Sequence, residues 1–469
     1  MHIEIQFQES VGHIKPLHGV NRSPIRLNAD KIEEFEKAGI PFVRTHDCGG
    51  AYGRGIFVDI PNLFRDFDAD ENAPESYDFA FTDRYLSCIV NAGAKIFFRL
   101  GVTIENNWRI RAYRVAPPKD FAKWARICEH VVRHYNEGWA NGFQWDIQYW
   151  EIWNEPENPP MWQGTREQFF ELYAAAATHL KNCFPAIKVG GYASCGFYSV
   201  NREGTNEFYK SFLTWYDEFL AYNRSHALPL DFFSFHLYTT KPEEIILHAN
   251  YAREKLDAAG FPAAELIFNE WNYTTSIRET LGTDFDAMKE LPGALFVAEA
   301  FCRMQDSPID KAMYYDAEPS SGYGGLFYFP SQRTTPTYQS FVAFNQLYQL
   351  GRQAKVTADL PEHAAVLAAT DGTTGRVLLV NRDINDFRIP FSCDMPLENM
   401  TARVLSQNGR FVPFPTERLP YLIQKEQLNL MHQTLLLLEI PFQGQANATP
   451  ATLASTGRQV QNNANGIDG

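Results

Sequence analysis

Two glutamates, Glu155 and Glu270, follow short apolar runs, and each is preceded by an asparagine. The runs are IQYWEIWNEPE at 147–157 and AELIFNEWN at 264–272. If both are strands of one parallel barrel, the two carboxyl groups share its mouth, because barrel active sites gather at the C-terminal strand ends. Such a pair suits glycoside hydrolysis, in which one carboxylic acid protonates the leaving oxygen and the other carboxylate attacks the sugar or activates water. A lone glutamate at such a position is more often a helix cap or an ion-pair partner, but the presence of two in these contexts favours a catalytic role.

The elements that would position these glutamates alternate along the chain from about residue 17. Apolar runs typical of parallel strands lie at 16–21, 41–47, 94–101, 147–157, 186–194, 230–239, 264–272 and 310–318. Amphipathic stretches typical of helices lie at 29–39, 82–93, 118–138, 165–184, 206–223, 241–260, 293–305 and 335–351. Eight strand–helix pairs predict an α/β fold, a (β/α)8 barrel. A doubly wound sheet is the alternative, but no GxGxxG follows the first run.

The composition changes after Gly351. Short alternating runs such as RVLLVNR and FRIPFSC are separated by turn signals such as TDGTTG, a pattern that predicts an attached antiparallel β-sandwich. We therefore expect residues 1–15 to supply a strand that joins the sandwich, 16–351 to form the barrel, and 352–445 to form the sandwich. The polar, aperiodic stretch 446–469 is expected to be a disordered tail.

Charge and composition narrow the class of partner. The 469 residues carry 42 basic and 56 acidic side chains, a formal net charge of −14, which argues against nucleic-acid binding. No apolar run approaches the ~20 residues of a membrane span. The aromatic content of 14% suits stacking against flat apolar ligand faces, although most of these rings must be core. The glutamate pair makes a carbohydrate the expected partner. An oligomer is compatible with the sequence.

Neither a cofactor nor a metal is expected. The seven cysteines have no regular spacing, and no CxxC or HExxH occurs, so they are interpreted as free thiols. A metal-dependent barrel enzyme using His46 and Asp47 would need further ligands at other strand ends. The start MHIEIQFQES lacks a basic segment followed by an apolar stretch, which predicts either a cytoplasmic protein or a mature form whose leader was removed.

The segments WEIWNEPE, SFHLY and FNEWN, in this order, resemble glycoside hydrolase family 39, the family of β-xylosidases and α-L-iduronidases. The resemblance runs from about Arg44 to Arg352 and includes the sandwich. It implies a retaining glycosidase of the clan with catalytic glutamates after strands four and seven. Glu155 would be the acid/base, Glu270 the nucleophile, and Asn154 the residue that binds the sugar 2-hydroxyl.

The resemblance also implies roles for residues on neighbouring strands. The position of Tyr238 donates a hydrogen bond to the nucleophile, and that of His236 lines the sugar subsite; a packed ring and a core histidine are the alternatives. Arg44 and His46 match the Arg-x-His segment of the family, with His46 as a sugar contact. Arg44 is expected to be structural, because Glu151 should point into the barrel, where Arg44 or Arg99 would neutralise it.

Two segments depart from the family pattern. Asp47-Cys48-Gly49-Gly50 stands where the family usually continues with glycine after the histidine. Strand eight, YYDAEPSSGYGGLFYF, lacks the family's tryptophan, so its substrate contact is assigned to Asp316, with Glu318 or Tyr323 as alternatives. The pair Asn106-Asn107, after strand three, is a further candidate for the cleft.

The chemistry makes different demands on the two glutamates. Glu155 must hold a proton near neutral pH, which the charge of Glu270 or desolvating rings such as Trp150, Trp153 and Trp162 would favour. Glu270 must stay ionised and therefore needs hydrogen-bond donors. For direct attack on the sugar, the carboxyl groups should lie about 5–5.5 Å apart.

The expected function is that of a retaining exo-acting hydrolase that releases a neutral sugar, a β-xyloside first and an arabinofuranoside second. One alternative is a noncatalytic carbohydrate-binding barrel that keeps the glutamates as hydrogen-bond acceptors. Another is a uronide-specific hydrolase, which would need a fixed arginine for the sugar carboxylate. Arg278 and Arg333 lie in the loops after strands seven and eight, outside the short strand-end motifs.

Overall fold

The computed structural model describes residues 1–26, 29–46, 58–102, 115–275, 281–319, 321 and 323–442. Several residues considered above lie outside the described residues: Asp47, Asn106, Asn107, Arg278 and the expected tail at 446–469. Among the described residues, no helix combines the length and the apolar character needed to cross a bilayer.

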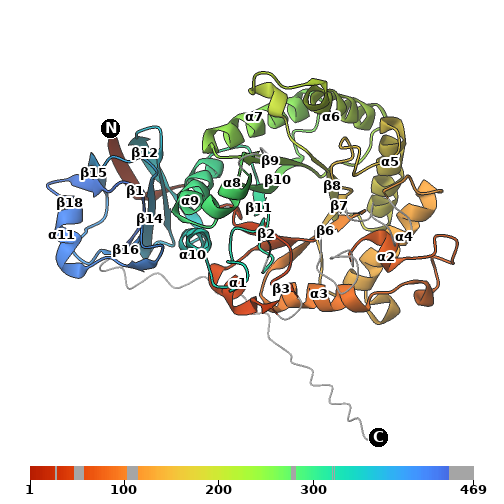
Figure 1. Ribbon diagram of the computed structural model, residues 1–469, viewed down its shortest axis with the longest axis horizontal. Helices are drawn as coiled ribbons and strands as arrows, with labels where there is room; N and C mark the ends of the chain where they lie inside the picture. The colour runs from red at the N-terminus through yellow and green to blue at the C-terminus, as the bar shows by residue number, and fades with distance from the viewer. Residues whose placement is uncertain are drawn as a thin grey trace, which may run out of the picture.

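Within the described residues, eight parallel strands close into a barrel (Figure 1). Each of the eight runs expected to be strands overlaps one of them, so the predicted (β/α)8 fold is confirmed. The strands are β2 (Gly19–Asn21), β5 (Phe42–Arg44), β6 (Lys95–Leu100), β7 (Tyr149–Ile152), β8 (Lys188–Ser194), β9 (Phe232–Thr239), β10 (Glu265–Tyr273) and β11 (Lys311–Tyr314).

The helices form a ring around the barrel (Figure 1). The expected helices are α1 (Ile32–Ala38), α3 (Ala80–Asn91), α4 (Phe121–Asn136), α5 (Arg166–Cys183), α6 (Glu207–Ser225), α7 (Pro242–Ala258), α9 (Leu291–Gln305) and α10 (Pro336–Tyr348). Thr165 caps α5 in a reciprocal capping box with Gln168. The short helices α2 (Ile60–Leu63) and α8 (Leu281–Ala287) and the small hairpin β3 (Ile25–Arg26) to β4 (Ala29–Asp30) were not predicted.

The barrel interior is layered because strand side chains alternate between its two faces. The lower layer is apolar and consists of Phe42, Phe97, Tyr149, Phe232, Ile267 and Met313. Two residues further along the same strands, the next layer is polar and contains Arg44, Arg99, Glu151, Ser234 and Asn269, all fully buried. The glutamates of interest lie beyond this polar layer, at the C-terminal mouth.

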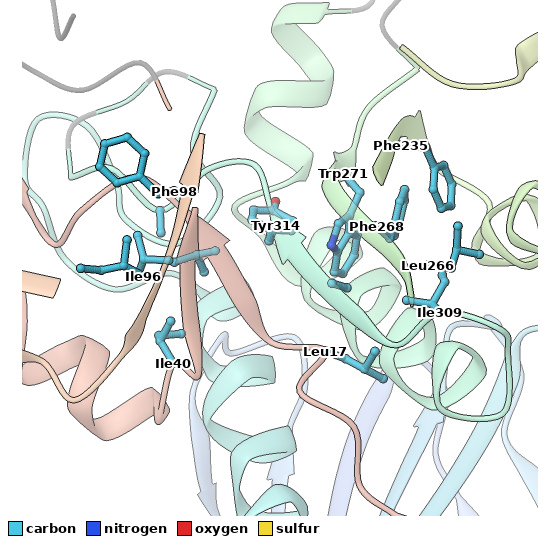
Figure 2. Packing of buried hydrophobic residues seen from close by; sticks show 14 of the residues in the cluster. Leu17, Ile40, Ile96, Phe98, Phe235, Leu266, Phe268, Trp271, Ile309 and Tyr314 are labelled. Atoms are coloured by element: carbon cyan, nitrogen blue, oxygen red, sulfur yellow. The ribbon is translucent and has the colours of Figure 1, made fainter. Parts of the chain in front are cut away.

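A β-bulge in β10 decides where Glu270 points. The pairing register with β9 shifts between Phe268 and Glu270: Phe268 pairs with Phe235 and Glu270 with His236, so Asn269 is an extra residue in β10. As a result, both Asn269 and Glu270 face the interior, whereas regular alternation would turn one of them outward. Phe268 and Trp271 then both pack outside the barrel, with ring centroids 5.8 Å apart, among the residues that Figure 2 shows.

Among the described residues, the C-terminal part forms a ten-stranded sheet beside α9 and α10 (Figure 1). Its strands are, in spatial order, β17 (Phe411–Pro413), β16 (Thr401–Leu405), β20 (Thr434–Pro441), β14 (Thr374–Asn381), β13 (Ala364–Thr370), β12 (Arg352–Asp359), β1 (His2–His13), β15 (Phe387–Cys393), β19 (Gln427–Leu430) and β18 (Ile423–Gln424), with the short helix α11 (Leu419–Leu422) before β18. Strand β1 runs antiparallel to β12 and parallel to β15.

Both faces of the sheet are buried where it meets the barrel. Along β20, Leu435 and Leu437 belong to the main core that includes α9 and α10. Leu436 and Leu438 belong to a second core, which residues of β15 and β19 complete from the other end of the sheet. The sheet thus folds over on itself as a sandwich and also braces the helices that follow β10 and β11, in agreement with the predicted fold class.

Candidate active site

Glu155 lies just beyond the end of β7, on backbone that the surrounding structure holds in an uncommon conformation. Trp153 and Glu155 have left-handed φ angles of 71° and 47°, and the Glu155 amide donates to the carbonyl of Ala193, 3.0 Å away. Among the described residues, the Glu155 side chain has His236 Nδ1 at 2.8 Å from Oε1, and Asn158 Nδ2 donates to Oε2 at 3.3 Å. Because non-glycine residues rarely adopt such angles, the tertiary contacts must fix this turn.

Glu270 is almost fully buried and is surrounded by hydrogen-bond donors. Arg44 and His46 Nε2 lie 2.8 and 2.9 Å from Oε1, and the Tyr238 hydroxyl donates to Oε2 at 2.8 Å. Burial alone would raise the pKa of this carboxyl, but His236, His46 and Arg44 together lower the pKa well below its ordinary value. Glu270 is therefore an anion held in one orientation.

The two glutamates face each other across a short gap. One oxygen of Glu155, one oxygen of Glu270 and a ring nitrogen of His236 all lie within 4.8 Å of one another. Inverting glycosidases keep their carboxyl groups about 6.5–9.5 Å apart to admit a water between them, whereas retaining ones bring them to about 5–5.5 Å. The nearest oxygens of the two carboxyl groups are thus no more than 4.8 Å apart, a short separation that is compatible with the retaining arrangement.

The polar layer beneath the site fixes Arg44. Its Nε pairs with Glu151 at 2.6 Å, as expected for a buried carboxylate. Ser234 and Asn269 donate to the other oxygen of Glu151. The second cation considered for this role, Arg99, pairs instead with Asp59. Arg44 also reaches Glu270, a contact that the sequence reading missed.

Asn154 uses one of its two side-chain polar atoms in a hydrogen bond. Its Oδ1 accepts a hydrogen bond from Arg44 at 2.6 Å. Since a guanidinium has only donors, this contact requires the amide oxygen to face Arg44 and leaves Nδ2 on the other side. Among the described residues, Nδ2 has no hydrogen-bond partner.

The two histidines expected to touch sugar lie against carboxylates. His46 is bonded to Glu270, and His236 lies between Glu155 and Glu270, 2.8 and 3.5 Å from their nearest oxygens. Tyr238 is bonded to Glu270, as the resemblance implied. All three side chains thus meet at the glutamate pair, which the spacing along the sequence alone does not reveal.

Asp316 is fully buried at the end of β11 and orders the loop that follows. It accepts hydrogen bonds from the amide of Glu318 at 3.0 Å and the hydroxyl of Ser321 at 3.2 Å, and it lies 3.2 Å from Arg22. Arg22 also pairs with Glu318. These contacts give Asp316 protein partners in the position where the sequence suggested a sugar contact.

Aromatic rings form one wall beside Glu270. Tyr315 lies 5.6 Å from His46 and 6.4 Å from Tyr238, measured between ring centroids. Tyr323 lies 5.7 Å from both Tyr238 and Tyr315. Tyr315 follows the last residue of β11 and was not singled out individually from the sequence; its neighbour Tyr314 packs outward against Trp271.

The three tryptophans expected around Glu155 pack elsewhere. Trp150 stacks on Phe98, with ring centroids 5.0 Å apart, and its indole donates to the carbonyl of Ile147. Trp153 packs edge-on against Trp162 at 5.0 Å and lies 6.2 Å from Trp124 of α4. Because Trp150 alternates with the inward-facing Glu151, it faces the helices. The ring contacts of these tryptophans are thus with other aromatic residues, and the close contacts found for the Glu155 carboxyl are polar, with His236 and Asn158.

Glu157 was not considered from the sequence, yet it is buried beside Glu155. Its Oε1 accepts hydrogen bonds from the Ser194 hydroxyl at 2.8 Å and the Cys195 amide at 2.7 Å. Burial raises the pKa of Glu157 to about 8, and the nearby charge of Glu155 adds to the rise. The only available signal was a second acid two residues after Glu155, and its burial is a tertiary property.

This raised pKa makes stability depend on pH. Below a pH of about 5, both the folded and the unfolded chain hold the proton of Glu157; between about 5 and 8, the unfolded chain releases it while the folded chain keeps it. The free energy of unfolding should therefore fall with rising pH, at most by about 1.4 kcal/mol per pH unit from this group. Glu157→Gln keeps an acceptor oxygen and cannot titrate, so the variant should gain stability over the wild type from pH 5 to 8. Parallel denaturation midpoints across this range would contradict the burial of a protonated Glu157.

The fold is a (β/α)8 barrel, and two glutamates lie close together at its C-terminal mouth. The family described as glycosyl hydrolases family 39 matches residues 6–264, and the chain belongs to this family. A β-xylosidase of Geobacillus stearothermophilus is 26% identical in an alignment 289 positions long that covers 55% of this chain and 52% of that protein. The chain thus spans about half the length of the curated relatives it matches.

Solved structures resemble the whole described architecture. A glucosidase from Croceicoccus marinus superposes with a TM-score of 0.71 at 24% identity, covering 94% of this chain and 98% of that one. A monomeric β-xylosidase from Caulobacter crescentus CB15 does so with a TM-score of 0.67 at 17% identity, covering 94% and 99%. At these identities, the likeness establishes the fold, including the attached sheet.

Proposed function

We propose that the protein is a retaining, exo-acting glycoside hydrolase that releases a neutral sugar by double displacement. The observation that carries the proposal is the glutamate pair: one oxygen of each carboxyl group lies within 4.8 Å of the other, and the two groups have unequal surroundings. Glu270, with three donors and a lowered pKa, is the nucleophile. Glu155, at the open side of the pair and bonded to His236, is the acid/base.

In the first step, the Glu270 carboxylate attacks the anomeric carbon while the bond to the leaving oxygen breaks. Glu155 gives its proton to that oxygen, and a glycosyl ester forms on Glu270. In the second step, Glu155 takes a proton from water, and the water oxygen attacks the same carbon. The ester bond breaks, and the sugar leaves with its original anomeric configuration. Arg44, His46 and Tyr238 stabilise the Glu270 carboxylate as attacking group and as leaving group.

Asn154 is proposed to bind the sugar 2-hydroxyl through Nδ2. Arg44 fixes the amide oxygen, so the nitrogen keeps one orientation without having to reorganise when substrate binds. Hydrogen bonds to the 2-hydroxyl strengthen in the transition state of glycosidases, which makes a fixed donor useful at this place.

A neutral sugar fits the surroundings better than a uronate. Arg22, the cation in contact with Tyr315, already faces two carboxylates, Asp316 and Glu318. Arg333 is exposed and packs over Tyr328. The tyrosine wall offers flat apolar faces for stacking, and a chain with net charge −14 has no long-range attraction for a polyanion. The names of the β-xylosidase relatives favour a β-xyloside.

A panel of nitrophenyl glycosides tests the proposal. We expect the β-xyloside to have the highest kcat/KM, the α-L-arabinofuranoside to come second, and an iduronide to be slower than both. An iduronide that exceeds every neutral glycoside would overturn the sugar class but not the glutamate roles. If no glycoside is hydrolysed while xylo-oligosaccharides still bind, the noncatalytic carbohydrate-binding barrel replaces the proposal.

A further inference from the structure

On the outer wall of the barrel, a glutamate, a histidine and a cysteine converge from two neighbouring helices. Glu129 lies on α4, and His179 and Cys183 lie one turn apart on α5. His179 Nε2 lies 2.6 Å from Glu129 Oε2 and 3.8 Å from Cys183 Sγ, and the three atoms all lie within 4.8 Å of one another. We propose that these three residues form a zinc site.

The geometry is close to what the ion requires. Tetrahedral zinc with bonds of about 2.0–2.3 Å places its nitrogen, oxygen and sulfur ligands roughly 3.4–3.6 Å apart. The histidine–cysteine pair is already near that separation. The glutamate and histidine atoms must move apart by less than about 1 Å, since the ion takes the place of the proton they now share. A small rotation of two surface side chains provides this movement.

The donor set selects the metal. Thiolate and imidazole ligands suit zinc, whereas calcium and magnesium require oxygen ligands. When the ion binds, the Cys183 thiol releases its proton to solvent. The His179 ring carries its remaining proton on Nδ1, so that Nε2 can coordinate. Three protein ligands leave the fourth position to a water molecule.

Surrounding residues support the cluster and leave it accessible. Arg133 holds the other oxygen of Glu129 at 2.7 Å, which fixes the carboxylate, and Glu137 lies against Arg133 and balances its charge. Glu129 and His179 are 14% and 30% exposed, so an ion can enter from solvent. The sequence shows no zinc motif because its ligands come from helices 50 residues apart.

Zinc at this place would cross-link α4 and α5. These helices precede and follow the segment that contains β7 and Glu155. Binding to the folded chain alone should therefore raise the melting temperature. The site lies outside the barrel mouth, and the inference stands independently of the proposed glycosidase activity.

The test uses the full chain, stripped of metal, with Zn²⁺ or Co²⁺ as the probe. We expect one Zn²⁺ per chain in competition with a chromophoric chelator, and a cobalt–thiolate charge-transfer band. Cys183→Ser should abolish the band, and both Cys183→Ser and His179→Ala should weaken Zn²⁺ binding at least tenfold. The matched controls Cys88→Ser, on α3, and His226→Ala, exposed at the end of α6, should bind as the wild type does.

A second readout needs no substitution: Zn²⁺ should protect Cys183 of the wild type from alkylation, as seen by peptide mass spectrometry. The proposal is overturned if Zn²⁺ leaves Cys183 equally reactive, or if binding survives both substitutions. Loss of binding in His236→Ala instead would place the ion at the cluster of Glu155, His236 and Glu270.

Discussion

Glu270→Gln is expected to lower kcat on every substrate by roughly 10⁴-fold or more, because no nucleophile remains to form the glycosyl ester. The amide is isosteric and buried, so the fold should persist. Arg44 keeps Glu151, but Arg44 and His46 both lose their ionic contact with Glu270, so the variant should also lose some stability. Initial rates on an activated aryl glycoside, whose leaving group needs no protonation, measure the effect without interference from Glu155.

Glu265→Gln is the matched control for this substitution. Glu265 lies on the same strand at the opposite end of the barrel, where it pairs with Lys188 and Lys311 and accepts from Tyr149. Its replacement should lower stability but leave kcat within a few-fold of wild type. Equal losses of activity in the two variants would mean that Glu270 acts through the structure of β10 and not as the nucleophile.

Glu155→Ala should show a dependence on the leaving group. Substrates with poor leaving groups should lose roughly 10²–10⁴-fold in rate, the usual contribution of a general acid, while activated substrates should form the glycosyl ester almost normally. The ester should then accumulate, because no base activates water. Azide needs no base, so its addition should restore turnover and give a glycosyl azide of retained configuration.

The same experiment assigns the two roles. Azide added to a Glu270→Ala variant should give, if any product, the azide of inverted configuration, since it attacks the sugar directly in place of the carboxylate. A glycosyl azide of retained configuration from the Glu270 variant would show that the roles assigned to Glu155 and Glu270 are reversed.

Much of this architecture was predictable because it depends on local patterns. Apolar runs buried on both faces, separated by amphipathic stretches, predicted each of the eight barrel strands and the helices around them. Glu155 and Glu270 could also be singled out from the sequence as candidates, because each lies in a short motif near the C-terminal end of an apolar run.

The remaining features of the site depend on tertiary structure. The bulge in β10 that turns Asn269 and Glu270 to the same side has no sequence signature. Regular alternation from Asn269 would therefore turn the Glu270 side chain away from the barrel interior. Closeness in sequence was likewise no guide to where the tryptophans point, because strand β7 ends at Ile152 and Trp153 adopts a left-handed φ. Arg44 was expected to serve Glu151 alone, but its guanidinium is large enough to reach Glu270 and Asn154 as well.

The anomeric configuration of the first product is the most direct test of the proposed mechanism. Proton NMR during the first minutes of hydrolysis of an aryl β-xyloside, before mutarotation, distinguishes the two anomers. Because one oxygen of Glu155 lies within 4.8 Å of one oxygen of Glu270, we expect direct attack by Glu270, and the first product should be the β-anomer, formed through an ester on Glu270. A first product of α configuration would require a water between the two carboxylates and would contradict double displacement.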